Sequence, residues 1–257
     1  MPIKTNLKTL TPRRQTYRRE ITLLSHGYSN PNAWPDGKLT VYPWDNAIDN
    51  WFLENTRRMS RQEVVYGLLK HCCDLNGGNV DTFVAEEITT VLLVSRALAS
   101  DGTLMYTPTC PFCGSKQKPC KIKVPDELQK LGEKSAGYPG YDVIELPVVK
   151  DVVKIRPLLV ADERSIASRT EENRAAVPDT ELRPLMRVVS INDTKPDTLD
   201  ELVVWFRALH ASDAKFLEDK GREITPHLNT AIPHICDERD CNQRFSFPLT
   251  LDQEFFR

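Results

Sequence analysis

The sequence lacks any apolar run that approaches the roughly 20 residues of a membrane-spanning helix. Glutamate, arginine or aspartate interrupts the longest candidates within a few positions. The first residues also lack the roughly 7–15-residue apolar core of a secretory signal. We therefore expect a soluble protein made in the cytoplasm and without a membrane span, whose seven cysteines are reduced thiols or metal ligands.

An excess of charge of one sign is missing too. The 257 residues carry 34 basic and 36 acidic side chains, for a net charge of -2. A surface built as a whole to neutralise phosphates is strongly basic, so any contact with nucleic acid has to be local. Because 40 % of the residues are hydrophobic, the chain can bury a core, and its length predicts between one and two domains.

Signatures of enzymes are absent as well. The chain contains no Gly-x-Gly-x-x-Gly, no Gly-x-x-x-x-Gly-Lys-Ser/Thr and no Gly-x-Ser-x-Gly sequence. The five histidines are scattered, and no His-Glu-x-x-His or His-x-Glu pattern supplies a base beside a metal. We predict no catalytic residue and expect that the protein is not an enzyme.

Short strands and helices alternate along the chain, which predicts an α+β fold. Extended segments are predicted at 21–24, 38–42 and 185–191, among others. Capping boxes that start at Ser60 and Thr198 predict two helices, and Asp81 and Ser212 are candidate N-caps of two more. The adjacent Cys72 and Cys73 fall in a helical pattern and are predicted to be core or boundary thiols.

Two cysteine pairs carry the chemistry, and each lies between short extended segments. The first is Cys110-Pro-Phe-Cys113-Gly and the second is Cys236-x4-Cys241. A turn with two thiolates a few residues apart can present both sulfurs to one ion, and two such knuckles complete a tetrahedral zinc site. The predicted architecture is therefore short strands and helical hairpins joined by a zinc-ribbon-like pair of two-cysteine knuckles.

The predicted ion is structural Zn²⁺, because four sulfur ligands leave no open position for water. Between Cys113 and Cys236 lie 122 residues, so the ion closes a large inserted segment. Cys120 or His234 is a possible replacement for one of the four ligands. A redox dithiol at the first pair is disfavoured, since the residues after Cys113 do not predict the helix that such a site opens.

These features divide the chain into five regions. They are a basic N-terminal arm (1–19), an N-terminal α+β region (20–109), a first knuckle hairpin (110–125), an inserted α+β subdomain with a helical hairpin (126–233), and a second knuckle with a C-terminal tail (234–257).

Three segments resemble the baseplate hub proteins of contractile-tailed bacteriophages of the T4 type. The segment 20–28 is similar to that family's N-terminal strand, although Leu24 stands where the family usually has proline. The segment 88–113 resembles the family's leucine-rich helix that leads through Arg, Ser-x-Gly and Tyr to Cys-Pro-x-Cys. The segment 152–163 is similar to the family's extended stretch before an acidic helix start.

The resemblance implies a structural protein of the tail baseplate, located in the virion and made in the host cytoplasm. Its partners would be other baseplate and tail proteins, in several copies within a symmetric assembly. In this family pattern, Cys110 and Cys113 form one half of a zinc finger, and Cys236 and Cys241 form the other. The resemblance implies no catalytic residue.

Two other functions remain open from the sequence. One is an assembly chaperone that helps to form the hub and is not retained in the particle. The other is a zinc-ribbon nucleic-acid-binding protein, in which the basic arm and the lysines of 116–123 contact phosphate. Contacts with partner proteins are predicted at segments without internal periodicity, namely the basic arm, the Trp34-Pro35 loop with Trp44 and Trp51, and Phe255-Phe256-Arg257.

Overall fold

The computed structural model describes residues 17–249. Most of the basic arm and the segment from Phe255 to Arg257 lie outside these residues. The described chain is a mixed α+β structure with eight α-helices and five small antiparallel sheets. The helices are α2 (Asn46–Asn55), α3 (Arg61–Cys72), α4 (Glu87–Leu98), α5 (Val160–Ala167), α6 (Glu171–Ala176), α7 (Asp179–Met186), α8 (Leu199–Ala208) and α9 (Ala211–Glu223).

The strands are two to five residues long. They are β1 (Arg19–Thr22), β2 (Lys38–Val41), β3 (Thr103–Tyr106), β4 (Cys120–Lys123), β5 (Lys130–Leu131), β6 (Asp142–Glu145), β7 (Val152–Ile155), β8 (Val188–Ile191), β9 (His227–Leu228), β10 (Ala231–Ile235) and β11 (Arg244–Pro248). The α+β class predicted from the sequence is thus correct for the described residues.

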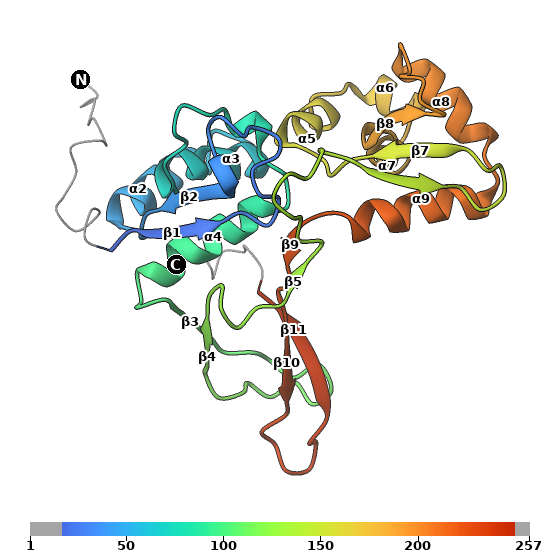
Figure 1. Ribbon diagram of the computed structural model, residues 1–257. Coiled ribbons are helices and arrows are strands. Elements are labelled where there is room, and N and C mark those ends of the chain that lie inside the picture. The colour runs from blue at the N-terminus through green and yellow to red at the C-terminus, as the bar shows by residue number, and fades with distance from the viewer. Residues whose placement is uncertain (1–16, 250–257) are drawn as a thin grey trace.

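The N-terminal lobe comprises β1, β2, α2, α3 and α4 (Figure 1). Its two strands pair antiparallel, with Ile21 opposite Leu39. The large aromatic rings of this lobe lie inside it. Trp34 is fully buried against Phe83, with the two ring centroids 4.5 Å apart, and Trp44 is also buried. The prediction that Trp34 and Trp44 offer partner surface is therefore wrong, because both rings stabilise the core instead.

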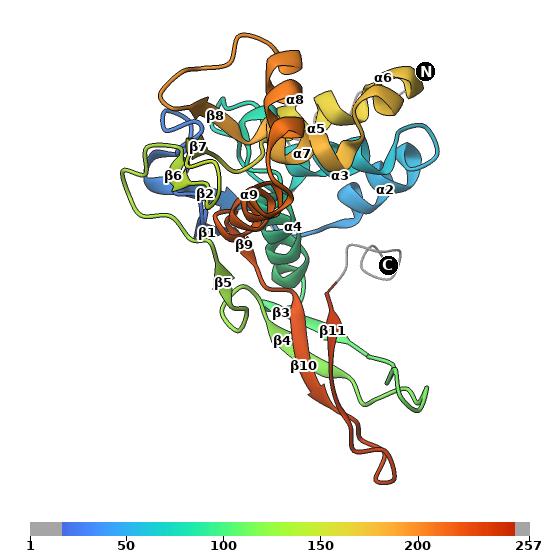
Figure 2. The ribbon, with the colours of Figure 1, turned by 90° about the vertical axis from the view of Figure 1, so that its right-hand side faces the viewer.

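The inserted lobe comprises residues 132–226 and has a hydrophobic core of its own. Its sheet has the strand order β6-β7-β8, and α8 and α9 supply the apolar side chains that cover one face. Figure 2 shows the strands on one side of this lobe and α7, α8 and α9 on the other. The chain enters the lobe through β5 and leaves through β9, which pair antiparallel and so bring the two ends of the insertion together.

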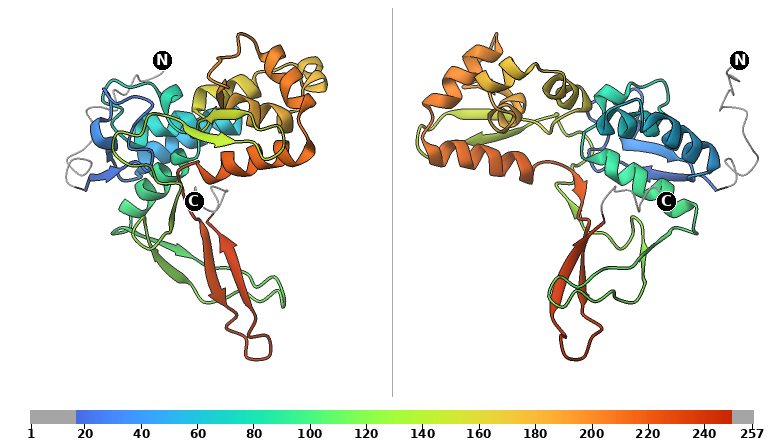
Figure 3. Two further views of the ribbon diagram at one scale, coloured as in Figure 1. Left: turned by 45° about the vertical axis from the view of Figure 1, so that its right-hand side comes forward. Right: turned by 180° about the vertical axis from the view of Figure 1, so that it is seen from behind.

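Two β-hairpins project to the same side of the two lobes (Figure 3). In one hairpin β3 pairs with β4, and in the other β10 pairs with β11, both antiparallel. Ile122 and Val124 at the root of the first, and Phe247 at the root of the second, are buried in the core of the N-terminal lobe. The hairpin ends that carry the cysteines therefore lie away from both cores and need another source of stability.

Local capping explains most helix starts and corrects two predictions. The side chains of Ser60 and Thr198 cap α3 and α8 by accepting hydrogen bonds from backbone N–H groups, as predicted. Asp81 caps no α-helix, because it lies in a single 3-10 turn, and its carboxylate pairs with Arg164. The N-cap of α9 is His210, whose Nδ1 accepts from the Ser212 N–H.

Candidate metal centre

The first cysteine pair lies in the loop between β3 and β4. An isolated bridge between Thr109 and Lys116 continues the hairpin pairing up to the loop. The Cys110 N–H donates to the Ser115 carbonyl at 3.0 Å, and the Gly114 N–H donates to the Cys110 carbonyl at 2.9 Å. Gly114 has a φ of 74°, a conformation that glycine adopts without steric cost. This tight turn places both sulfurs toward the second hairpin.

The second pair lies in the loop between β10 and β11. The Cys236 N–H donates to the Gln243 carbonyl at 3.0 Å, so Cys236 continues the ladder directly after β10. A turn through Glu238 follows, in which the Cys241 N–H donates to the Glu238 carbonyl at 3.1 Å. Both pairs therefore arise from the same local device, a short antiparallel hairpin whose loop carries two thiols.

The four sulfurs converge. Cys110 Sγ lies 3.8 Å from Cys241 Sγ, and Cys113 Sγ lies 3.6 Å from Cys236 Sγ. All four sulfur atoms lie within 4.8 Å of one another. Tetrahedral zinc with Zn–S bonds of about 2.3 Å requires sulfurs about 3.8 Å apart, so the arrangement fits this ion. The separations are far too long for disulfide bonds, and the four cysteines are free thiols.

Hydrogen bonds join the two knuckles independently of the sulfurs. Gln117 is buried, and its Oε1 accepts from the Asp237 N–H at 2.6 Å. The Asp237 carboxylate in turn accepts from the Lys118 N–H at 2.8 Å. These two contacts run between segments about 120 residues apart and hold the loops in position around the sulfurs. Hydrogen bonds around the ligand residues of a metal site orient those ligands in the same way.

The surroundings shift the pKa values of Cys113 and Cys236 in opposite directions. Hydrogen bonds from the backbone and side chain of Ser115 lower the pKa of Cys113 to about 6. Burial raises the pKa of Cys236 to about 12. The lowered pKa of Cys113 favours its thiolate, which is the form that binds metal ions.

The structure does not bring Cys120 and His234 into the four-sulfur cluster. They face each other instead, with Cys120 Sγ 3.7 Å from His234 Nδ1. The other ring nitrogen of His234 lies 4.0 Å from the Asp237 carboxylate. Because the two ring nitrogens point to different neighbours, these residues form a chain beside the cluster. Cys72 and Cys73 are buried in the N-terminal lobe, as predicted.

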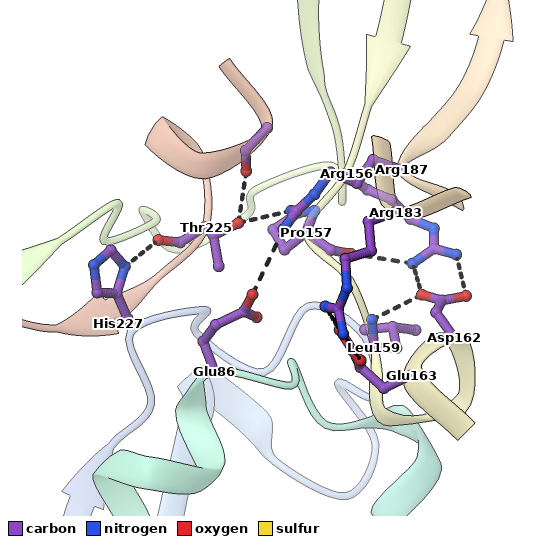
Figure 4. A network of polar contacts seen from close by, with 11 residues as sticks. Glu86, Arg156, Pro157, Leu159, Asp162, Glu163, Arg183, Arg187, Thr225 and His227 are labelled. Carbon is purple, nitrogen blue, oxygen red and sulfur yellow. Dashed lines mark hydrogen bonds and ion pairs between the residues drawn. The ribbon is translucent and has the colours of Figure 1, made fainter. Parts of the chain in front are cut away.

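Sequence reasoning missed a polar network between the two lobes, which Figure 4 shows from close by. Arg187 donates to Thr225 Oγ1 at 2.7 Å and lies 3.5 Å from the Glu86 carboxylate at the start of α4. Arg156 makes a bidentate pair with Asp162, at 2.6 and 2.9 Å. The residues of this network are scattered between 86 and 225 and no spacing links them, so the sequence alone did not predict it.

A second buried feature lies next to this network. Glu87 is 1 % exposed, and its Oε1 accepts a hydrogen bond from the Ser25 N–H at 2.7 Å. Burial raises the pKa of Glu87 to about 7. The adjacent Glu86 also has a raised pKa, for the same reason.

None of the helices between residues 17 and 249 has the length and hydropathy needed to cross a membrane. Comparison with protein-family models, curated proteins and solved structures finds no match to this chain.

Proposed function

We propose that the chain is a structural component of a contractile phage tail baseplate that acts through protein–protein interfaces. The support is the segment 88–113, whose sequence resembles the baseplate hub family. In the fold this segment is one continuous unit, from α4 through Gly102 and β3 into the first cysteine pair.

Structural zinc is the second part of the proposal. Four thiolates favour a soft, tetrahedral ion, and zinc is the expected one in a reducing compartment. Cys110, Cys113, Cys236 and Cys241 would hold it, and the ion would supply a cross-link between the two hairpins. With the ion bound, the two knuckles would form a zinc-ribbon-like pair. Since the four protein sulfurs fill the coordination sphere, no catalytic role follows from this site.

The experiment that tests the baseplate proposal is quantitative mass spectrometry of purified tailed particles. The copies of this chain are counted against a tail protein of known copy number. We expect a fixed small number, which a structural part in a symmetric assembly requires. Absence from finished particles, together with presence in infected cells, would contradict the proposal and favour an assembly chaperone that is not retained.

Binding of nucleic acid is the less favoured function. Lys118, Lys121 and Lys123 are exposed on the first hairpin, as a phosphate-binding face requires. The second knuckle, however, brings Asp237 and Asp240 to the same end of the hairpins. Mixed charge of this kind weakens phosphate attraction, whereas it suits a protein partner.

A further inference from the structure

A cavity of about 950 Å³ lies between the two hairpins and the C-terminal end of α4. Figure 2 shows the hairpins β3–β4 and β10–β11 beneath α4. Three stretches of chain form the walls of the cavity, and its lining includes Arg96, Met105, Tyr106, Lys116, Ser246 and Phe247. The Tyr106 and Phe247 rings stack directly on each other, with centroids 4.9 Å apart and planes within 8°.

One wall is the edge of β3 that faces away from β4 and pairs with no other strand within residues 17–249. The Val124 N–H donates to the Gly102 carbonyl, and the Gln117 N–H donates to the Pro108 carbonyl, so the even-numbered residues of this strand bond toward β4. The backbone groups of Met105 and Thr107 consequently point away from β4. Consecutive residues from Thr103 to Thr109 line the cavity, as expected of a strand edge rather than a strand face.

The opposite wall is the edge of β11 that faces away from β10 and pairs with no other strand in the described part of the chain. The Cys236 N–H donates to the Gln243 carbonyl, and the Leu249 N–H donates to the Thr230 carbonyl. The odd-numbered residues of β11 therefore bond toward β10. The backbone groups of Ser246 therefore point away from β10. Consecutive residues from Phe245 to Leu249 line this side of the cavity. Both walls thus offer main-chain donors and acceptors to a segment that enters between them.

The charged side chains among the described lining residues of the cavity are all positive. Arg96 and Lys116 line it, and no aspartate or glutamate is among the described lining residues. Neither cation takes part in an ion pair within residues 17–249. Arg96 lies over the Trp44 ring, 5.7 Å from its centroid, which leaves its charge uncompensated by a carboxylate. An occupant with carboxylates would supply the missing negative charge.

We propose that this groove binds an extended segment of a partner protein that carries apolar and acidic side chains. The main chain of the segment adds to one of these two strand edges, its apolar side chains pack against the exposed Met105 and the Tyr106 ring, and its carboxylates approach Arg96 and Lys116. The two strand edges favour a peptide over a nucleic acid, because they offer main-chain donors and acceptors to another strand. The inference goes beyond the proposed baseplate function and does not require it.

The test measures binding of fluorescein-labelled octapeptides to the full chain by fluorescence anisotropy. One peptide alternates glutamate with valine and phenylalanine, and the other has lysine in place of every glutamate. We expect the glutamate peptide to bind with a dissociation constant in the micromolar range and the lysine peptide to bind at least tenfold more weakly. Equal binding of the two peptides, or no binding of either, would overturn the proposal.

Matched charge reversals locate the binding. Lys116→Glu changes a lining residue, whereas Lys121→Glu changes an exposed lysine of β4 that does not line the cavity. We expect the first variant to weaken binding of the glutamate peptide at least tenfold and the second to change it less than twofold. Thermal unfolding of both variants should match that of the unsubstituted chain, because both side chains are exposed. Equal effects of the two substitutions would contradict the assignment.

Two further arms separate other occupants. A single-stranded oligonucleotide that binds more tightly than the glutamate peptide and competes with it would assign the groove to nucleic acid. A variant without residues 250–257 that binds the glutamate peptide tenfold more tightly would assign it to the chain's own end. Either result would overturn the proposal of a partner segment, and neither depends on whether particles contain this chain or whether the cysteines bind zinc.

Discussion

Glu87 carries a carboxyl group into the interior of the N-terminal lobe. The Ser25 N–H satisfies one carboxyl oxygen, but Oε2 has no hydrogen-bond partner within the described residues. A charged carboxylate is expensive at such a position, and burial consequently raises the pKa of Glu87 to about 7. In the folded protein, the carboxyl group of Glu87 therefore loses or gains its proton close to neutral pH.

We predict that Glu87 makes the protein less stable as the pH rises. The folded state holds the proton more tightly than the unfolded chain, in which a glutamate titrates near pH 4.3. Stability should therefore fall between about pH 4 and pH 7 and stay constant above that range. The full effect of a shift from 4.5 to about 7 is about 3 kcal/mol.

The measurement is the free energy of unfolding in urea at pH 5 and pH 8. Glu87→Gln keeps an oxygen that can accept from Ser25 and removes the titration. Between pH 5 and pH 8, the free energy of unfolding of this variant should fall by up to about 3 kcal/mol less than that of the unsubstituted chain. Glu172→Gln, at an exposed position of α6, is the control. Parallel pH profiles for the chain with and without Glu87 would refute the prediction.

At the scale of elements, helix ends and cysteine hairpins show what local sequence decides. Ser60 and Thr198 cap their helices because the capping oxygen and the N–H that it accepts from lie only three residues apart. The predicted strand–knuckle–strand pattern around Cys110 and Cys113 is likewise present. The prediction of extended structure from Leu185 was partly wrong, because α7 continues to Met186 and β8 begins at Val188.

We predict that an ion held by the four cysteines cross-links the two hairpins and that loss of one ligand removes it. Cys236→Ser should lower the metal content from about one ion per chain to none. Closing a loop of 100 residues stabilises a protein by about 4.7 kcal/mol in the chain-entropy account, and the loop between Cys113 and Cys236 is of similar length. At about 2–4 °C per kcal/mol, the melting temperature of the transition that includes the hairpins should fall by about 10–20 °C.

Metal content is measured by elemental analysis of protein purified without chelator, and stability by calorimetry. Cys120→Ser is the matched control, since Cys120 lies on the same hairpin but outside the four-sulfur cluster. We expect it to retain the ion and most of the stability. Loss of metal from the Cys120 variant, or full stability of the chain after exhaustive chelation, would show that the assignment of ligands or the cross-link is wrong.

At the scale of the whole molecule, three parts meet through contacts of different kinds. The inserted lobe has its own core and joins the N-terminal lobe through the β5–β9 pair, through α5 and through the Arg187–Glu86 contact. The hairpin ends have no comparable core, because only their roots pack into the N-terminal lobe. Stability should therefore be unequal over the molecule, and removal of the ion should act locally.

Hydrogen–deuterium exchange with and without chelator tests this expectation. We predict that amides in 109–117 and 235–244 exchange at least tenfold faster after chelation. The sheet formed by β6, β7 and β8 should keep its exchange rates, since its core shares no residue with the hairpins. A uniform increase over all three parts would instead mean that the hairpins and the lobes unfold as one unit.

Features that depend on neighbours along the chain follow from the sequence alone. The α+β class, the capped starts of α3 and α8 and the two cysteine hairpins follow from local spacing, because their hydrogen bonds join residues a few positions apart. Which cysteines meet depends instead on the folded chain, since Cys110 and Cys241 are separated by 131 positions in the sequence. The folded chain also determines that Trp34 is buried, that Cys120 faces His234 and that the hairpins enclose a groove. Contacts of this range are set by how the lobes pack, and no sequence spacing records that packing.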